Sequence, residues 1–216
     1  MWKSHAYGKS GLYFLMLIIL SGIALSCSKD NKTPEKPAAL ATNPYSNESV
    51  FDELRRKTEK NPEDAESLYH LADLYERNSQ YAEAIETYRK VVKLNPKSDI
   101  NLGYVHFKIG TDLDRTDHAE GAVDEFKKAT KYLTDYPVLY NNMGVAYGKL
   151  GRLDDEIAAL KKAIRLRPAY SSARYNLGIT YMKKKNIKAA MIEYDALKRY
   201  DEGVAEALLK EIKLGS

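Results

Sequence analysis

Apolar residues recur at helical spacing from residue 48 almost to the end of the chain. Leu68, Leu71, Ala72 and Tyr75, for example, are three or four positions apart, so they share one face of a helix. The same spacing returns in each later segment. The pattern predicts an all-α domain of nine to eleven helices without strands.

The pattern also repeats, at an interval marked by proline. Pro62 and Pro96 are 34 residues apart, and Pro168 closes a later unit. Proline ends a helix because it lacks an N–H and clashes with the preceding turn. A repeat of this length indicates helix hairpins stacked in a row, each burying its apolar face against its neighbours. Four units are expected, at 65–98, 99–136, 137–170 and 171–204, and the second has four extra residues, which we place in its inter-helix loop.

Within a unit, small and large residues hold fixed positions. Positions 8 and 20 are small, as in Ala72 and Ala84, whereas positions 4, 7, 11 and 24 are large, and Glu156 departs from this by replacing the small residue at position 20. This arrangement resembles the tetratricopeptide repeat over about 140 residues. The resemblance implies an α-solenoid whose first helices line a concave groove. Residues 48–64 and 205–216 are expected to form capping helices that cover the terminal apolar faces.

The N-terminus has the pattern of a signal peptide. Lys3 and Lys9 precede Leu12–Leu25, a run of 14 uncharged residues. A helix of that length covers about 21 Å, which is short of the ~30 Å hydrocarbon core of a membrane. The run therefore favours an export signal over a membrane-spanning helix.

The run ends in the tetrapeptide 24–27, Ala-Leu-Ser-Cys, which resembles a bacterial lipobox, although the usual leucine-then-small order is reversed. The resemblance implies removal of residues 1–26 and lipidation (including palmitate) of Cys27, with 27–47 as the lipidated cysteine and flexible tether. The protein would then contact the membrane of the bacterial cell envelope through its lipid anchor only, with the outer membrane favoured over the inner. The alternative is an ordinary secretory signal with an incidental cysteine.

Composition excludes several functions. The chain has one cysteine and four histidines, too few for a thiolate or histidine metal centre. The net charge of +4, from 34 basic and 30 acidic residues, is too small to indicate nucleic-acid binding. Asp112, Asp114 and Asp117 lack the glycine and glutamate of a calcium loop. No nucleophile–base set appears, so we expect no enzyme activity and no cofactor. Most of the seventeen tyrosines have the spacing of packing wedges.

The resemblance places six positions of each first helix on the groove. Asn142 and Asn176 both hold position 6, in register, and an amide that donates and accepts suits the backbone of an extended peptide. The alternative is that they bond only to their own scaffold. An apolar stripe is expected beside them. The remaining candidate peptide-binding residues are Asn141, Tyr69, Tyr104, Phe107, Val145, Tyr175, Ile179 and Lys183.

Two functions remain open. The first is a lipid-anchored scaffold or adaptor that binds a protein or peptide partner in the cell envelope. The second is a helper module of a solute transporter that binds a small or apolar ligand in the groove, which a closed pocket lined by the aromatic residues of the second unit would favour. Residues 48–136 hold 14 basic and 19 acidic side chains and residues 137–216 hold 15 and 9, a polarity that allows a homo-oligomer to form head to tail.

Overall fold

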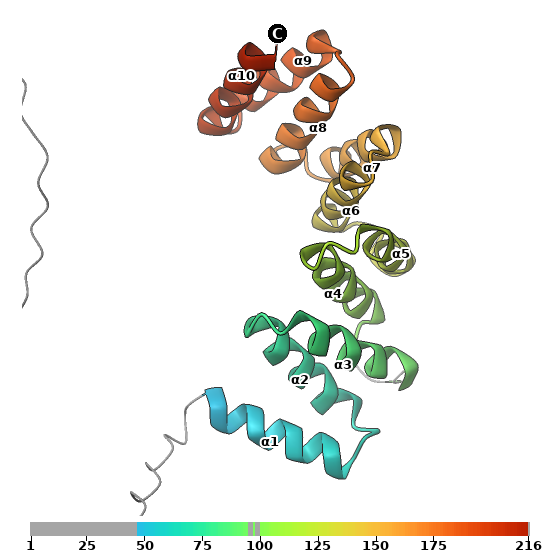
Figure 1. Cartoon of the computed structure of the whole chain (residues 1–216). Helices are drawn as coiled ribbons and strands as arrows, with labels where there is room; N and C mark the ends of the chain where they lie inside the picture. The colour runs from blue at the N-terminus through green and yellow to red at the C-terminus, as the bar shows by residue number, and fades with distance from the viewer. Residues whose placement is uncertain (1–46, 95–96, 98–99, 216) are drawn as a thin grey trace, which may run out of the picture. The chain divides into compact units, whose positions relative to one another are not determined.

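The computed structural model describes residues 47–94, 97 and 100–215, and in this part of the chain every regular element is an α-helix (Figure 1). The all-α prediction is confirmed. The signal segment, Cys27 and most of the tether lie outside the described residues. The helices are α1 (Asn47–Lys60), α2 (Ala65–Arg77), α3 (Tyr81–Leu94), α4 (Leu102–Arg115), α5 (Ala119–Ala129), α6 (Pro137–Lys149), α7 (Leu153–Leu166), α8 (Ser171–Lys183), α9 (Ile187–Leu197) and α10 (Glu202–Gly215).

The helices pack as four hairpins with an extra helix at each end. The pairs α2–α3, α4–α5, α6–α7 and α8–α9 form the hairpins, and the second helix of each packs on the first helix of the next. Helix α1 packs on α2, and α10 packs on both α8 and α9. Successive hairpins therefore share one continuous row of contacts, which is the architecture of an α-solenoid.

Glycine allows the two helices of a hairpin to approach closely. A Cβ added to Gly110 would lie 2.7 Å from Cδ1 of Phe126, and one added to Gly144 would lie 2.8 Å from Cγ of Leu160. These glycines hold position 8 of their hairpins, opposite the large residue at position 24. The small residue is thus required by the packing of a specific side chain from the partner helix.

The second unit differs from the sequence prediction. Helix α4 ends at Arg115 and α5 begins at Ala119, so the turn has three residues, as in the other hairpins, and the expected long inter-helix loop of unit 99–136 is wrong. The extra residues lie ahead of the unit, between Leu94 and Leu102. The unit therefore starts four residues later, at 103, because the small residue that must face α5 is Gly110.

In a unit that starts at 99, His106 would hold position 8. In the observed unit, which starts at 103, it holds position 4. Its Nδ1 lies 2.7 Å from Oε2 of Glu125, whose other oxygen accepts from Lys128 at 2.7 Å. Burial raises the pKa of the Glu125 carboxyl, but the hydrogen bonds from His106 and Lys128 outweigh it and hold that pKa below its ordinary value. His106 is thus a structural histidine, paired across its hairpin.

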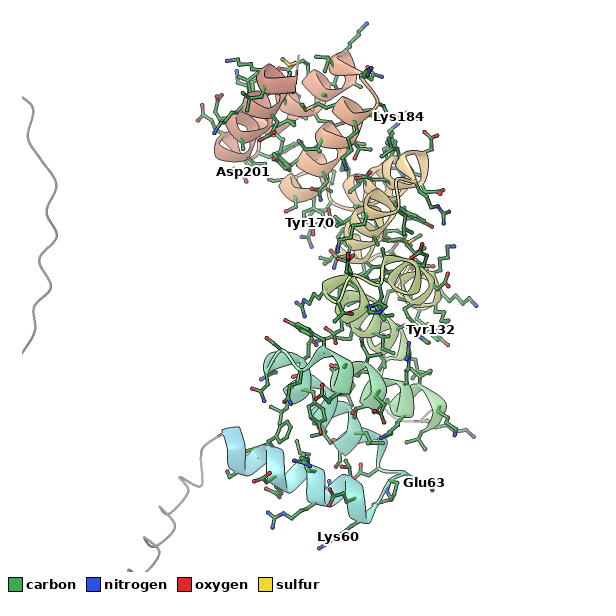
Figure 2. The ribbon with its side chains drawn as sticks, viewed as in Figure 1. Lys60, Glu63, Tyr132, Tyr170, Lys184 and Asp201 are labelled. Atoms are coloured by element: carbon green, nitrogen blue, oxygen red, sulfur yellow. The ribbon has the colours of Figure 1, made fainter. Side chains whose placement is uncertain are left out.

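The turns inside the hairpins share a left-handed residue at their centre. Ser79, Asp117, Gly151 and Lys185 have φ of 59°, 63°, 69° and 58°. The left-handed conformation lets the chain reverse within three residues. Figure 2 shows one such turn beside Lys184, where the chain leaves α8 for α9.

Two of the tyrosines with the spacing of packing wedges are buried between helices. Tyr88 is fully buried at position 24, with its hydroxyl 3.4 Å from Oε2 of Glu76, and burial raises its pKa well above the ordinary value. Tyr147 is also buried. In the described part of the chain, every helix is too short or too polar to cross a membrane.

Candidate binding face

The first helices of the hairpins, α2, α4, α6 and α8, carry the positions that the resemblance assigns to the groove. We call the side chains at positions 2, 5, 6, 9, 12 and 13 of these helices the first-helix face. The corrected start of the second unit changes its contribution, and Lys108 now holds position 6, equivalent to His70, Asn142 and Asn176. The second unit contributes Tyr104, Phe107, Lys108, Thr111, Asp114 and Arg115.

Ion pairs join α2 and α4 in the N-terminal half of this face. Nζ of Lys108 lies 2.7 Å from Oε2 of Glu76 and 3.2 Å from Oδ1 of Asp73, and Arg115 lies 3.0 Å from Oε1 of Glu76. Burial opposes the charge of Lys108, but Glu76 and then Asp73 outweigh it and raise its pKa. The two basic side chains of α4 are therefore paired with acidic side chains of α2.

Asp112 lies beneath this network and is completely buried. Its Oδ1 accepts from Arg115 at 3.2 Å, and its Oδ2 has no hydrogen-bond partner in the described structure. Burial, and then the negative charge of Glu76, raise the pKa of this carboxyl to about 7, although Arg115 and Lys108 act in the opposite direction. The group therefore titrates near neutral pH.

In the C-terminal half of this face, three asparagines are linked by hydrogen bonds. Nδ2 of Asn176 donates to Oδ1 of Asn141 at 3.1 Å, and Nδ2 of Asn141 donates to Oδ1 of Asn142 at 3.3 Å. The expected pair, Asn142 and Asn176, is thus joined through Asn141 and not directly. Nδ2 of Asn142 and Oδ1 of Asn176 make no hydrogen bond to the described part of the chain. The amide group of Asn142 thus remains as a donor and the oxygen of Asn176 as an acceptor, and a peptide backbone requires both kinds of group.

The apolar stripe is shorter than expected. Val145, Ile179 and Tyr175 are half-buried and Tyr104 is exposed, as their positions on the face require. Phe107 is a correction, because it is only 9% exposed and faces the core.

The ring of Phe107 lies 6.0 Å from that of Phe126 and 5.3 Å from that of Tyr136, and Tyr69 is half-buried with its ring 5.9 Å from that of Tyr88. The aromatic residues of the N-terminal half therefore pack against other side chains. Packed in this way, they give no support to the transporter alternative, which requires a closed pocket lined by such residues.

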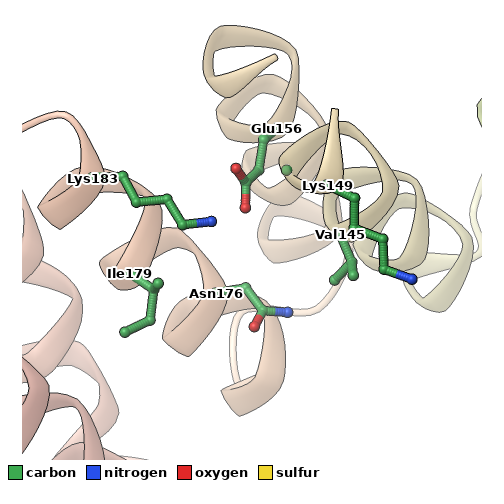
Figure 3. Close-up of a pocket in the computed structure, with 7 residues that line it drawn as sticks. Val145, Lys149, Glu156, Asn176, Ile179 and Lys183 are labelled. Atoms are coloured by element: carbon green, nitrogen blue, oxygen red, sulfur yellow. The ribbon is translucent and has the colours of Figure 1, made fainter. Parts of the chain in front are cut away.

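A hollow of about 240 Å³ lies between α6, α7 and α8. Figure 3 shows the carboxylate of Glu156 entering from α7, with the ammonium group of Lys183 directed into the same space and that of Lys149 directed away. Glu156 is 4% exposed, and its Oε2 has no hydrogen-bond partner in the described structure. The lining residues are Val145, Gly148, Lys149, Glu156, Asn176, Ile179 and Lys183.

Two residues, Lys108 on this face and Glu156 beside it on α7, were not among the sequence candidates. Lys108 was missed because the second unit was placed four residues too early. Glu156 was noted only as a departure from the repeat, yet a charged residue at a position otherwise held by alanine was the available signal. In the described residues, no group of three or more histidine, cysteine or carboxylate side chains could hold a metal ion.

Comparison with known proteins identifies the repeats. Models of the tetratricopeptide repeat match residues 65–98, 149–185 and 171–204. The peroxisomal targeting signal receptor of Eremothecium gossypii is 31% identical over 101 residues, which cover 45% of this chain and 17% of the receptor. The chain spans about a third or less of the length of the first curated relatives that it matches.

Solved structures show the same fold. The crystal structure of MamA has a TM-score of 0.68 at 22% identity, covering 74% of this chain and 91% of MamA. YrrB, a tetratricopeptide protein with an unusual peptide-binding site, has a TM-score of 0.67 at 20% identity, covering 76% of this chain and 84% of YrrB. The chain contains tetratricopeptide repeats and folds as an all-α tetratricopeptide solenoid.

Proposed function

From this solenoid of tetratricopeptide repeats, a protein-interaction scaffold, we propose that the chain binds an extended peptide segment of another envelope protein while a lipid on Cys27 holds it at the membrane. The binding region is the C-terminal half of the first-helix face. The lipid anchor and the envelope setting rest on the lipobox-like residues 24–27 and on the apolar run before them. No catalytic step is part of the proposal.

The contrast between the two halves of the face carries the proposal. In the N-terminal half, Lys108 and Arg115 are paired with acidic residues of α2. In the C-terminal half, Asn142 and Asn176 each keep one hydrogen-bonding group unused, beside the open hollow lined by Val145 and Ile179. An extended peptide offers alternating N–H and C=O groups and apolar side chains, which complement this half.

The relatives support the interaction class. The peroxisomal targeting signal receptor and YrrB, by their names, recognise a targeting signal and a peptide. Both proteins are similar to this chain in its repeats, and the repeats are the region that we propose binds the peptide. The relatives thus support a peptide as the class of ligand, and the partner protein is identified by the crosslinking experiment below.

Crosslinking tests the peptide-binding part. The full chain is expressed in bacteria, crosslinked in the intact envelope and recovered, and wild type is compared with the double variant Asn142→Ala plus Asn176→Ala. We expect the variant to lose the wild-type crosslinked partner. Asn78→Ala, in the turn after α2, is the control and should retain it. Equal recovery in all three proteins would refute binding through the asparagines.

The anchor has its own test. Cys27→Ala should yield a soluble protein, whereas wild type should need detergent for extraction. Continued dependence of the variant on detergent would contradict lipidation of Cys27. Because this readout is independent of the partner, either half of the proposal can fail alone.

A further inference from the structure

The hollow at Glu156 contains a buried carboxylate, which a groove that binds peptides of any sequence does not need. Resting on the proposed function, we propose that this hollow is a specificity site which receives a lysine or arginine side chain of the bound peptide. The buried carboxylate of Glu156 would pair with the cationic head. The partner would then be a peptide with a basic residue at the position facing α6, α7 and α8.

Packing does not account for a glutamate at residue 156. The equivalent position 20 of the other three hairpins is held by Ala84, Ala122 and Ala190, each completely buried. Glu156 places a carboxylate at that point, and its Oε2 lacks a hydrogen-bond partner in the described structure. An ionised carboxylate left buried and unpaired costs free energy, which a cation brought by a ligand would offset.

The opposite helix is shaped to admit this carboxylate. Gly148 holds position 12 of the first-helix face, where the other hairpins have Glu76, Asp114 and Met182. A Cβ at Gly148 would lie 2.7 Å from Oε1 and 2.8 Å from Oε2 of Glu156. The absence of a side chain at Gly148 on α6 therefore leaves room for the long side chain of Glu156 from α7.

The walls suit the stem of a basic side chain. Val145 and Ile179 offer apolar surface to the methylene groups, and Oδ1 of Asn176 is an acceptor that makes no bond within the described chain. Long basic side chains commonly bury their stems on such surface while their heads bind polar groups. A hollow of about 240 Å³ has room for several water molecules, which the side chain would displace.

The chain's own cations leave the carboxylate unpaired in this structure. Lys149 lies 2.8 Å from Oδ1 of Asp114 and donates to the carbonyl oxygen of the same residue. Lys183 is exposed and has no ion pair within the described part of the chain, although its ammonium group points toward the hollow. Lys183 is therefore the internal competitor that any test must separate from a ligand.

The test uses small probes that need no known partner. N-acetyl-lysine N-methylamide and the arginine equivalent are titrated into the full chain, and the amide NMR signals of Gly148 and Asn176 are followed. N-acetyl-norleucine N-methylamide, which has an apolar stem without the charge, is the matched probe. We expect saturable shifts with the two basic probes only. Equal shifts with norleucine would overturn the proposal.

Three variants locate the effect. Glu156→Gln keeps the shape and removes the charge, and Glu156→Ala restores the residue found in the other hairpins, so both should fold. Each should weaken the basic probes about tenfold or more, in line with the loss of a charge-assisted hydrogen bond. Glu120→Gln, an exposed position on α5, should not. Unchanged affinity in the Glu156 variants would overturn the proposal, as would probe binding that appears only after Lys183→Gln, since Lys183 would then fill the hollow itself.

The crosslinked partner separates this inference from the proposed function. If the double asparagine variant loses the partner and Glu156→Gln retains it at full recovery, the groove binds peptide but the basic-residue site is refuted. If neither variant affects recovery, the proposed function fails as well. Loss in both, together with saturable binding of the lysine probe, supports both.

Discussion

At the scale of single residues, two buried carboxylates among the described residues, Asp112 and Glu156, lack full hydrogen bonding. Asp112 is enclosed by its own chain, between Arg115 and the negative charge of Glu76. Glu156 instead borders an open hollow. The same departure from ordinary burial therefore has different consequences: a pH-dependent cost in stability at Asp112 and a proposed contact with a partner at Glu156.

Asp112 makes stability depend on pH. Its pKa is about 7 in the folded protein and near 3.9 in an unfolded chain, so the folded state binds more protons between these values. Its contribution to the free energy of unfolding therefore becomes less favourable as the pH rises from about 4 to 7. Asp112→Asn should remove this penalty and stabilise the protein by roughly 1–3 kcal/mol more at pH 8 than at pH 5.

Denaturant unfolding at the two pH values measures this difference. Asp117→Asn, in the exposed turn after the same helix, is the control and should change little at either pH. An Asp112→Asn effect of the same size at pH 5 and pH 8 would show that the carboxyl does not titrate in that range.

At the scale of elements, local signals decide where a helix begins. Asp64 precedes α2, and its carboxylate accepts from the backbone N–H of Ser67 at 3.0 Å and from its hydroxyl at 2.8 Å. These bonds, the backbone one first, lower the pKa of Asp64. The cap thus satisfies an N–H that the first turn of a helix leaves without a partner.

Loss of this cap should be measurable. Asp64→Ala is expected to lower the free energy of unfolding by about 1 kcal/mol at pH 7. Because the folded pKa of Asp64 is lowered, the difference should begin to shrink as the pH falls below the ordinary aspartate value of about 4, and it should be lost once the folded carboxylate is protonated at still lower pH. Chemical unfolding of Glu63→Ala, an exposed neighbour, supplies the baseline; a loss as large as that of Asp64→Ala would argue against capping.

The sequence predicts the helices well, but it does not fix where the extra residues of the second unit lie. Leu68, Leu71, Ala72 and Tyr75 predict a helix because a 3.6-residue period leaves few alternatives, and the structure confirms it as α2. The position of the extra residues near the second unit could not be fixed in this way. His106 and Gly110 are four apart and share a face, so periodicity alone does not decide which of them meets α5.

The candidate site was less predictable than the fold. The repeat pattern assigns Asn142 and Asn176 to the first-helix face, but not the link between them through Asn141. Phe107 was expected to be exposed, yet it lies in the core. The position of a residue in a helix gives the direction of its side chain, but it does not show which neighbouring side chains cover it. Pairings across hairpins, such as Lys108 with Glu76, depend on tertiary distances that the sequence does not contain.

At the scale of the whole solenoid, each hairpin depends on the next for burial. Helix α10 supplies the last layer: Ala205, Leu208 and Ile212 are buried with residues of α9, and a Cβ at Gly178 would lie 2.6 Å from Cδ2 of Leu208. The terminal helix is therefore part of the core of the fourth hairpin.

Removal of α10 should damage this end. Deletion of residues 202–216 exposes the apolar surface of α8 and α9, and we expect the free energy of unfolding to fall by about 2–5 kcal/mol, from the lost burial of two large side chains. The exposed surface should also promote self-association. Thermal unfolding and sedimentation velocity measure the two effects.

A shorter truncation is the control for this deletion. Removing residues 214–216 takes away Leu214, which is 74% exposed, and leaves Leu208 and Ile212 in place. This protein should remain as stable as wild type and keep its association state. If the longer deletion behaved identically, α10 would not be a structural layer.

The position of α10 also limits how such a gene can change. Because α10 covers α8 and α9, a hairpin duplicated directly after α10 would meet the outer side of this helix, where most of the exposed side chains are charged. A copy inserted ahead of α8 would meet the same kinds of neighbour that every internal hairpin already has. Descendants of this protein with more repeats should therefore have acquired them ahead of α10, which would still cover the hairpin before it.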